Sequence, residues 1–419
     1  MNIAQLYQLY RETYLVDTDT RKIRKGAIFF ALKGDNFNGN EFAEEALKSG
    51  ANYVVIDEIE YKTNSKTILV ENVLETLQKL ANFHRKQLAI PIISLTGSNG
   101  KTTTKELINA VLSKKYACVA TLGNLNNHIG VPLTLLSMTP KTEIGIVEMG
   151  ANHIKEIEFL CKIAEPTYGL ITNFGKAHLE GFGSIEGVIK GKSELYDFLR
   201  LTKGTVFINA DDKLQEKQSA GINVIKFNKN DIKFLEANPF VTVQFKNILI
   251  ESKLIGKYNY NNIAIAVAVG NYFDISETDI KIAVENYTPT NNRSQIIQKG
   301  TNKIILDAYN ANPTSMQAAL ENFAQLKDKN KIVFLGDMFE LGKDSKAEHE
   351  KIANLVASYH FSKVFLIGKA FSTTSAKNAL VSESYESFKN SSSYSNINNA
   401  TILIKGSRGM ALERLLDLL

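Results

Sequence analysis

The sequence is poor in the residues that mark disulfide-bonded, metal-binding and membrane proteins. It has two cysteines, Cys118 and Cys161, which lie among apolar residues and lack the spacing of metal ligands. We therefore expect two free, buried thiols in a reducing compartment. No apolar run reaches the ~18 residues that a transmembrane helix needs, and the polar N-terminus has no apolar signal core. These absences predict a cytoplasmic protein without a membrane span.

Charge of neither sign is concentrated in the chain. Lysine and arginine number 49 and aspartate and glutamate 44, which gives a formal net charge of +5 over 419 residues. No block of basic residues of the kind that binds nucleic acid is present, so we expect no nucleic-acid partner. A mild positive charge suits small anionic substrates. At roughly 100–200 residues per domain, the length predicts about two to three domains.

The motif around which the chain is organised is IISLTGSNGKTTTKE at residues 92–106. Ile92–Leu95 predicts a buried strand, and Lys101 opens a helix after a glycine-containing loop. This order is typical of nucleotide sites, because backbone N–H groups and the helix N-terminus face the phosphates. Lys101 would neutralise the anion and Thr102 would place a hydroxyl on Mg²⁺. The expected ATP contacts are Gly97, Ser98, Asn99, Gly100, Lys101, Thr102 and Thr103.

Strand and helix patterns alternate along the chain and predict an α/β protein with parallel sheets. Residues 1–88 predict a small α/β N-terminal domain, and residues 89–290 a central domain with the phosphate loop on a parallel sheet. A Pro/Asn-rich segment at 286–293 predicts a linker. The rhythm then restarts and predicts a Rossmann-like domain over 291–419, without the G-x-G-x-x-G fingerprint of dinucleotide sites. Two smaller elements are expected: a hairpin at 241–250 appended to the central sheet, and a helix at 410–419.

Two polar side chains follow strands close to the phosphate loop in the predicted sheet. Glu148 ends the apolar strand 144–148, where an acid commonly holds or orients nucleotide-bound Mg²⁺. The alternative is an acid in solvent at the end of a strand. His178 follows the next strand, and a lone histidine is more often structural than a ligand. Position in the sequence therefore favours a metal-binding role for Glu148 and does not decide between a ligand and a structural role for His178.

A lysine falls on the apolar face of a predicted helix at 184–199. Apolar residues repeat there at helical spacing, and Lys192 lies on their stripe whereas Lys190 points away from it. An inward lysine is costly unless its charge is matched or its chemistry changes. Two interpretations remain: the ammonium snorkels to solvent, or the desolvated amine reacts with CO₂ to give an anionic carbamate that helps to bind a second metal.

Three further groups are candidates for nucleotide contacts. Asn259 and Asn262 lie one turn apart at the start of a predicted helix, where amides can read an adenine edge or simply cap the helix. Arg293 lies in the linker, from which it can reach a γ-phosphate when domains close; otherwise it is solvated. Asp307 ends the first strand of the third predicted domain.

Together these segments resemble the Mur ligase family, ATP-dependent amide-forming enzymes of peptidoglycan synthesis. The resemblance covers essentially the whole chain: TGSNGKTTTKE at 96–106, GNLNNHIGVPLTLL at 123–136, EMGANHIKEI at 148–157, AHLEGFGS at 177–184, KGKSELY at 190–196, DAYNANPTSM at 307–316, LGDMFELG at 335–342 and KGSRGM at 405–410. The stretches GNLNNHIGVPLTLL and DAYNANPTSM are most similar to the branch that adds D-alanyl-D-alanine. The Asp-Asn-Pro-Arg motif of the diaminopimelate-adding branch is absent.

The resemblance implies an activity and its cofactors. It implies three domains, which bind a UDP-sugar, ATP and the incoming amine. It further implies that D-alanyl-D-alanine is joined to UDP-N-acetylmuramoyl-tripeptide through an acyl phosphate, giving the pentapeptide, ADP and phosphate. The implied cofactors are ATP, two Mg²⁺ ions and a carbamylated Lys192. We expect a monomer.

The resemblance also implies roles for individual residues at matched positions. Lys101, Lys192, His178 and Arg293 would be catalytic, and Thr102, Glu148, His178 and Lys192 would bind metal. Asn259 and Asn262 would lie near adenine, Arg293 near the γ-phosphate and Asp307 near the ribose. The UDP-substrate would contact Thr20, Arg21, Lys33 and Gly34, and the acceptor would contact Asn310, Asn312, Ser407 and Arg408. Two positions depart from the family pattern, with Tyr258 replacing a usual histidine and Asn292 a usual glycine.

Three other functions share part of this pattern. A sister Mur-type ligase that adds a diamino acid is disfavoured by the NANP stretch at 310–313. A folylpolyglutamate synthetase is disfavoured by the uridine-type loops of the first domain. A non-catalytic nucleotide-binding switch would not need the second metal site that Glu148, His178 and Lys192 suggest.

Overall fold

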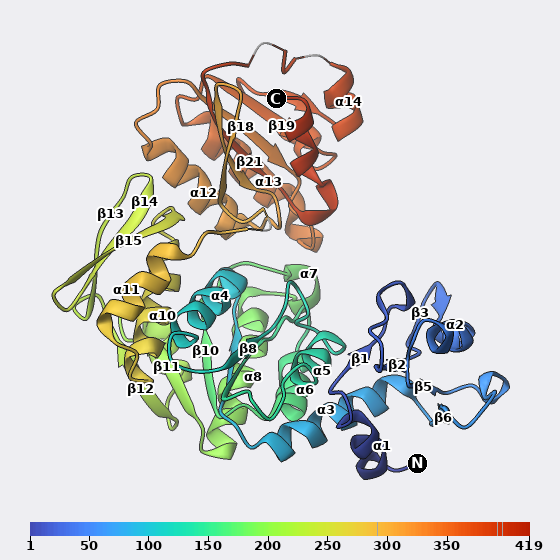
Figure 1. The fold of residues 1–419 in the computed structure, drawn as a ribbon. Coiled ribbons are helices and arrows are strands. Elements are labelled where there is room, and N and C mark those ends of the chain that lie inside the picture. Colours follow the sequence, from blue (N-terminus) through green and yellow to red (C-terminus); the bar gives the residue numbers. More distant parts are fainter. Residues whose placement is uncertain (291, 392, 396) are drawn as a thin grey trace.

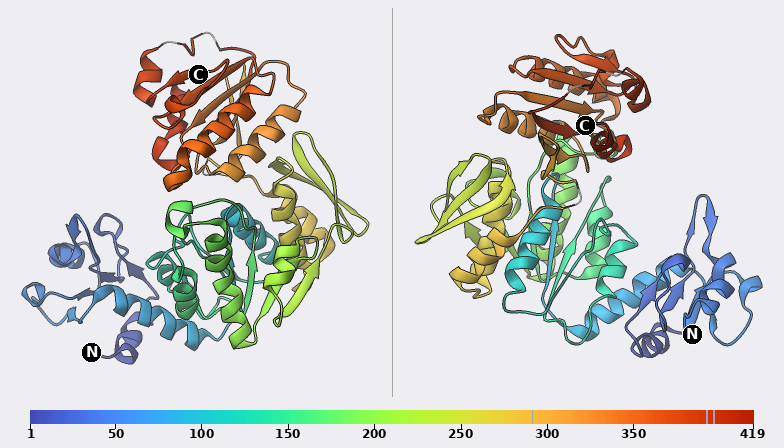
Figure 2. Two further views of the ribbon diagram at one scale, coloured as in Figure 1. Left: turned by 180° about the vertical axis from the view of Figure 1, so that it is seen from behind. Right: turned by 45° about the horizontal axis from the view of Figure 1, so that its top comes forward.

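The computed structural model describes residues 1–290, 292–391, 393–395 and 397–419. Three α/β units follow one another along the chain (Figure 1). The N-terminal and C-terminal units both adjoin the central unit and lie apart from each other (Figure 2). Residue 291 of the predicted linker lies outside the described residues. The three large sheets fall within the three predicted ranges, whose boundaries stay predictions.

The N-terminal unit is built on a four-stranded parallel sheet of order β1-β2-β5-β6. Its last helix, α3, packs against helices α1, α5 and α6 and so joins this unit to the central one (Figure 2). A short antiparallel hairpin, β3–β4, follows β2. The elements are α1 (Ile3–Tyr10), β1 (Val16–Asp17), β2 (Ile28–Phe30), β3 (Lys33–Gly34), β4 (Phe37–Asn38), α2 (Ala43–Lys48), β5 (Tyr53–Ile56), β6 (Thr67–Leu69) and α3 (Val73–Leu88).

The central unit has a six-stranded sheet of order β12-β11-β10-β7-β9-β8 with every pairing parallel. Successive residues of a strand face opposite sides of a sheet; Ile92 accordingly packs into one core and Ile93 into another. The elements are β7 (Ile92–Thr96), α4 (Lys101–Leu112), β8 (Cys118–Ala120), α5 (Gly130–Leu135), β9 (Ile144–Glu148), α6 (Glu156–Ala164), β10 (Tyr168–Ile171), α7 (Leu179–Phe182), α8 (Ile185–Thr202), β11 (Thr205–Asn209), α9 (Lys213–Gln218), β12 (Asn223–Phe227), α10 (Asn259–Tyr272) and α11 (Glu277–Asn286).

The hairpin predicted at residues 241–250 forms, but the prediction that it is appended to the central sheet is wrong. Strands β14 (Phe240–Phe245) and β15 (Ile248–Ile255) do form an antiparallel pair, but with β13 (Ile232–Ala237) they make a separate three-stranded sheet. This small sheet packs against α10 and α11 because its inward residues, such as Val243 and Ile250, complete their apolar core.

The C-terminal unit has a sheet of order β16-β17-β21-β18-β19-β20, parallel except for the antiparallel edge strand β16. The predicted helix at 410–419 is wrong: this segment forms two 3₁₀ turns, Arg408–Met410 and Leu412–Asp417, separated by Ala411 at a positive φ of 48°. The elements are β16 (Gln295–Lys299), β17 (Asn302–Asp307), α12 (Pro313–Gln325), β18 (Lys331–Gly336), α13 (Ser345–Ala357), β19 (Lys363–Ile367), β20 (Leu380–Ser382), α14 (Tyr385–Asn390) and β21 (Thr401–Lys405).

Two expectations from composition can be compared with the fold. Within the described ranges, the helices are all too short or too polar to cross a membrane. Both cysteines are free thiols, with Cys161 buried and Cys118 only partly so. Burial raises the pKa of the Cys118 thiol to about 11.

Candidate active site

The phosphate loop begins at the carboxyl end of β7 and ends at the N-terminus of α4, as the motif predicts. Two of its glycines have positive φ, +147° at Gly97 and +81° at Gly100. A Cβ atom at Gly97 would lie 1.9 Å from the Thr172 hydroxyl, and one at Gly100 would lie 2.4 Å from the Asn262 side-chain oxygen. Glycine is therefore required at both positions by backbone conformation and by space.

The segment that follows β10 holds this loop in place. The Asn99 backbone N–H donates to Asn173 Oδ1 at 3.1 Å, and the Asn99 carbonyl accepts from Asn173 Nδ2 at 2.9 Å and from the Thr172 hydroxyl at 2.6 Å. Sequence reasoning missed Asn173, although an amide directly after a strand beside the loop was the available signal. The loop is thus pre-organised by its neighbours as well as by its own glycines.

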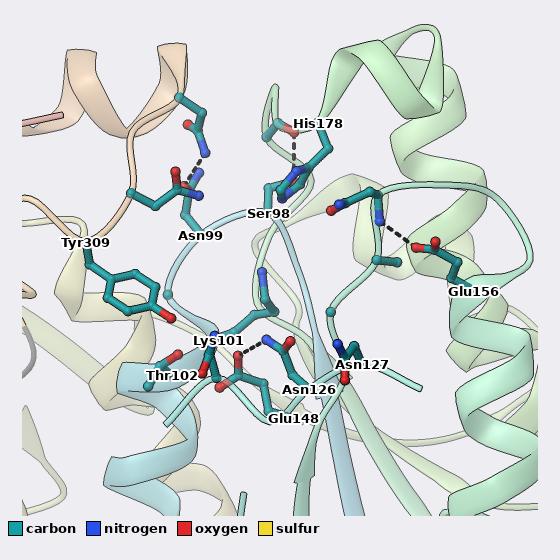
Figure 3. Close-up of a pocket in the computed structure, with 18 of the residues that line it drawn as sticks. Ser98, Asn99, Lys101, Thr102, Asn126, Asn127, Glu148, Glu156, His178 and Tyr309 are labelled. Atoms are coloured by element: carbon teal, nitrogen blue, oxygen red, sulfur yellow. Dashed lines mark hydrogen bonds between the residues drawn. The ribbon is translucent and has the colours of Figure 1, made fainter. Parts of the chain in front are cut away.

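Lys101 and Thr102 open α4 and face the cavity that the loop borders (Figure 3). The Lys101 ammonium donates to the Gly97 carbonyl at 2.8 Å. Burial lowers the pKa of Lys101, and the charge of Glu148 opposes that shift. The Lys101 ammonium and the Thr102 hydroxyl therefore lie where an anion bound at the loop would contact them.

Glu148 has one carboxylate oxygen satisfied and one free. Its Oε1 accepts from Asn126 Nδ2 at 2.8 Å (Figure 3), and its backbone N–H donates to the Thr121 hydroxyl at 2.9 Å. The side chain is buried, and Oε2 has no hydrogen-bond partner among the described residues. A buried, unpaired carboxylate oxygen beside a phosphate loop fits a cation. In the described part of the chain, however, no three acidic, histidine or cysteine side chains cluster as a ready-made metal site.

His178 faces the C-terminal unit. It adopts a positive φ of 52° before α7, and its Nδ1 pairs with the carboxylate of Glu340. This hydrogen bond lowers the pKa of Glu340. Glu340 comes from the LGDMFELG segment and was not singled out from the sequence, because only the tertiary fold brings it to the central unit.

Lys192 lies on the inward face of α8, as its spacing predicts. Its side chain has no exposed surface, which excludes the snorkelling interpretation. The Nζ atom donates to the Ala151 carbonyl at 3.1 Å and lies 5.1 Å from the centre of the Phe182 ring. Burial and the charge of Lys101 hold the pKa of Lys192 well below its usual value. Ala151, but not Lys192 itself, lines the cavity.

The expected adenine residues bond to one another. Asn262 Nδ2 donates to Asn259 Oδ1 at 2.8 Å, and Asn262 Oδ1 accepts from the Thr104 hydroxyl at 3.1 Å. Both amides are buried and line the cavity. Tyr258, a departure from the family pattern, lines it too and places its hydroxyl 2.9 Å from that of Ser294, which directly follows the linker.

Asp307 and Arg293 come to the same cavity from β17 and the linker. Asp307 Oδ2 forms an ion pair with Lys405 at 2.5 Å, and Oδ1 accepts from the Ser294 N–H at 3.1 Å. The Arg293 guanidinium lies 3.7 Å from the centre of the Tyr309 ring. Lys405 and Tyr309 were missed from the sequence; each lies within two residues of a residue that was singled out.

The four expected acceptor residues are not brought together. Asn312 caps α12 and its Nδ2 donates to Asn99 Oδ1 of the phosphate loop at 2.7 Å. Asn310 is exposed at the cavity edge. Ser407 is buried, accepts from the Phe339 N–H and lines neither described cavity, while Arg408 is exposed and lines a smaller one.

The four expected UDP-substrate residues lie in the N-terminal unit, away from the phosphate loop. Thr20 and Arg21 begin a short 3₁₀ turn, and Arg21 pairs with Asp19 at 2.8 Å. Lys33 lies next to Gly34 on β3 and pairs with Asp57 at 3.0 Å. Lys33 also pairs with Glu58 at 3.2 Å. A ligand that uses either cation would have to share or displace the carboxylates that it now contacts.

One cavity of about 1240 Å³ unites the central groups. It runs from the N-terminus of α3, past the phosphate loop and Glu148, to Asp307 and Lys405 of the C-terminal unit. In Figure 3 the Lys101, Thr102, Asn126 and Glu148 side chains gather in one part of it. Such a volume is large for a single small ligand, and its walls come from all three units.

Comparison of the sequence with known protein families gives three matches that follow one another along the chain. Residues 12–85 match the Mur ligase family catalytic domain, residues 95–270 the Mur ligase middle domain and residues 292–408 the Mur ligase glutamate ligase domain. The UDP-N-acetylmuramoyl-tripeptide–D-alanyl-D-alanine ligase of Bacillus subtilis (strain 168) is 34% identical over 426 residues, which cover 97% of this chain and 93% of that protein. The chain belongs to the Mur ligase family.

Solved structures of this family share the whole fold. MurF from Acinetobacter baumannii superposes with a TM-score of 0.86 at 27% identity, covering 99% of this chain and 97% of that one. The MurF ligase of Thermotoga maritima, solved in complex with ADP, gives a TM-score of 0.83 at 27% identity over 98% of this chain and 97% of that one. The α/β class and the three-unit Mur ligase fold are thereby confirmed.

Proposed function

We propose that the chain is an ATP-dependent ligase that joins D-alanyl-D-alanine to UDP-N-acetylmuramoyl-tripeptide, giving the pentapeptide, ADP and phosphate in peptidoglycan synthesis. The observation that carries the proposal is the single cavity in which the phosphate loop meets groups from all three units. The B. subtilis relative supports the choice of substrates, because its name states this reaction and its sequence aligns along almost the whole chain.

The reaction proceeds in two steps. The terminal carboxylate of the tripeptide attacks the γ-phosphorus of ATP, so that ADP leaves and an acyl phosphate forms. The amine of D-alanyl-D-alanine then attacks the acyl carbon, loses a proton and expels phosphate through a tetrahedral intermediate. Closure of the three units around the substrates would exclude water, which would otherwise hydrolyse the acyl phosphate.

Lys101 and Arg293 supply cationic charge for the first step. The carboxylate and the triphosphate are both anionic, so their approach needs positive charge at the place where the phosphoryl group moves. Lys101 enters from α4 and Arg293 from the linker, where the Tyr309 ring supports its guanidinium. A guanidinium held flat against an aromatic ring keeps its hydrogen-bond fork available to phosphate oxygens.

The polar groups around Glu148 suit two Mg²⁺ ions. Thr102 and Glu148 would hold one ion, and Glu148, His178 and a carbamylated Lys192 would contribute to a second. When bound, the ions would neutralise phosphate charge. The unpaired Glu148 Oε2 and the buried, pKa-lowered Lys192 amine support this assignment. In the present arrangement His178 bonds to Glu340, so it would have to exchange that partner for metal.

The remaining roles follow the three units. Residues 1–88 would bind the UDP-sugar through Thr20, Arg21, Lys33 and Gly34, residues 89–290 would bind ATP, and residues 291–419 would close over it and bind the dipeptide. Gly97 to Thr103 would cradle the phosphates, Asn259 and Asn262 would lie near adenine and Asp307 near the ribose. We infer a cytoplasmic monomer.

An acceptor panel tests the proposal. Purified protein with ATP and Mg²⁺ is given the tripeptide donor with D-alanyl-D-alanine, meso-diaminopimelate or glutamate, and in a separate arm a folate with glutamate. Both phosphate and product are measured in every arm. We expect product with D-alanyl-D-alanine alone. Turnover only with diaminopimelate would identify a sister ligase, and turnover only with glutamate and a folate would identify a folylpolyglutamate synthetase. Nucleotide binding without acceptor-dependent phosphate release would indicate a switch module.

A further inference from the structure

One buried cation of the central unit takes no part in the reaction described above. Lys105 lies on α4, one helical turn after Lys101, and only 3% of its side-chain surface is exposed. It lines neither of the two described cavities. Burial of an ammonium group is unfavourable unless hydrogen bonds and a counter-charge accompany it. The contacts of Lys105 therefore show what its burial achieves.

The Lys105 ammonium bonds to the segment that begins directly after β8. Its Nζ atom donates to the Thr121 carbonyl at 2.6 Å, and the Glu106 carboxylate lies 3.6 Å from the same nitrogen. Glu106 in turn accepts from the Tyr287 hydroxyl at 2.5 Å, at the C-terminal end of α11. The ammonium is thus held between its counter-charge, which Tyr287 fixes, and the backbone of Thr121.

Thr121 connects Lys105 to Glu148. The Thr121 hydroxyl accepts from the Glu148 backbone N–H at 2.9 Å. At the other end of segment 121–126, Asn126 Nδ2 donates to Glu148 Oε1 at 2.8 Å (Figure 3). This segment therefore holds Glu148 both by its backbone and by its carboxylate, and Lys105 holds the first residue of the segment.

We propose that Lys105 is a positioning residue, which fixes Thr121 and through it the direction of the unpaired Glu148 Oε2 beside the phosphate loop. This inference rests on the function proposed above, in which Glu148 holds Mg²⁺. Partners that orient a metal ligand contribute roughly 10- to 100-fold to metal affinity or activity. A charged donor suits this task, because its hydrogen bond is about twice as strong as that of a neutral donor.

The test measures how far Mg²⁺ tightens nucleotide binding. The dissociation constant of β,γ-methylene ATP is measured by calorimetry in EDTA and with Mg²⁺, and the ratio of the two constants is the magnesium effect. Lys105→Met keeps an unbranched side chain but removes the donor. We expect the magnesium effect to fall about tenfold, the lower end of the range for such partners, and binding in EDTA to stay unchanged. The kcat for pentapeptide formation should fall by the same factor, with the KM for D-alanyl-D-alanine unchanged.

Two further variants separate positioning from stability. Thr121→Val removes the hydroxyl but no charge, and it should lower the magnesium effect as much as Lys105→Met does. Because the two groups act in series, the double variant Lys105→Met with Thr121→Val should lose no more than either single variant. The double variant Lys105→Met with Glu106→Gln leaves no carboxylate without its cation. It should resist urea better than Lys105→Met and keep the reduced magnesium effect, and it replaces Lys105→Met in the test if that variant does not fold.

Lys114→Met is the matched control, because Lys114 is exposed just beyond the end of α4. It should keep the wild-type magnesium effect. A wild-type magnesium effect in Lys105→Met, or its recovery when Glu106→Gln is added, would overturn the positioning role. Failure of the proposed function gives a different result: wild type then shows the magnesium effect but makes no pentapeptide from D-alanyl-D-alanine.

Discussion

Two lysines are buried on opposite sides of the active-site cavity, and their surroundings differ. Lys405 of the C-terminal unit bonds to the Asp307 carboxylate at 2.5 Å and to the Asn310 carbonyl at 3.3 Å. Lys192 of the central unit meets one carbonyl oxygen and the face of Phe182. A buried cation is tolerated when a counter-charge accompanies it, and otherwise the neutral form is favoured. The same residue type is therefore an ion-paired cation in the C-terminal unit and an amine with a lowered pKa in the central unit.

The largest expected effect is on activity when Lys192 is lost. Lys192→Ala should lower kcat by about 10²–10³-fold, the order seen when one charge-stabilising group is removed from an active site. Added bicarbonate should restore part of the activity by entering the vacated space. Lys190→Ala, on the exposed face of the same helix, is the control and should behave as wild type. Wild-type turnover in Lys192→Ala would disprove a role for the carbamate.

Direct detection of a carbamate tests whether Lys192, and not Lys405, reacts with CO₂. Wild type equilibrated with ¹³C-labelled CO₂ should show a carbamate carbon resonance that Lys192→Met lacks. Lys405 should give none, because its amine is engaged with Asp307. Labelling at Lys405 instead of Lys192 would reverse the assignment of the two lysines.

The next effect concerns stability on the Lys405 side. Lys405→Met leaves the Asp307 carboxylate without its ion-pair partner and should lower the unfolding free energy by about 3 kcal/mol, near the lower end for broken buried pairs. The double variant Lys405→Met with Asp307→Asn should recover most of that loss, as measured by denaturant unfolding. Equal destabilisation of the single and double variants would show that the pair itself contributes little.

The same substitution at Lys192 should act in the opposite direction. In CO₂-depleted buffer, Lys192→Met should unfold with the same or a higher free energy than wild type, by up to about 1 kcal/mol, because no ion pair is broken. The folded pKa of Lys192 is lowered, so at neutral pH the unfolded chain binds a proton that the folded chain lacks. The unfolding free energy of wild type therefore rises with pH toward the ordinary lysine pKa of roughly 10.4. The difference in unfolding free energy between wild type and Lys192→Met becomes smaller over the same range.

The smallest effect concerns the contact that joins the two sides. Asn312→Asp keeps the helix cap of α12, since aspartate caps as well as asparagine, but it replaces the donor to Asn99 with an oxygen. We expect turnover to fall about tenfold, the value of one hydrogen bond of roughly 1.5 kcal/mol, with unfolding unchanged. Asn312→Ala should lose both turnover and stability. Equal stability loss in both variants would mean that the cap alone matters.

Local features of the site were predictable from the sequence. The phosphate loop, its two constrained glycines and the inward position of Lys192 follow from short-range patterns, because strand, loop and helix geometry is set by neighbouring residues. Glu148 was found for the same reason, as an acid that ends an apolar strand. The partners Glu340, Lys405 and Tyr309 were missed, because they approach the loop only through the packing of the C-terminal unit on the central one.

The acceptor residues show the limit most clearly. Ser407 and Arg408 are adjacent in the motif KGSRGM, yet Ser407 is buried and accepts from the Phe339 N–H, whereas Arg408 is exposed and lines the smaller cavity. By itself the sequence determined the order of α/β units, the phosphate loop and the buried amine, since these depend on local periodicity and turn chemistry. Only the tertiary structure decided which buried lysine has a carboxylate beside it and which arginine lines the main cavity, because both depend on contacts between residues far apart in the sequence.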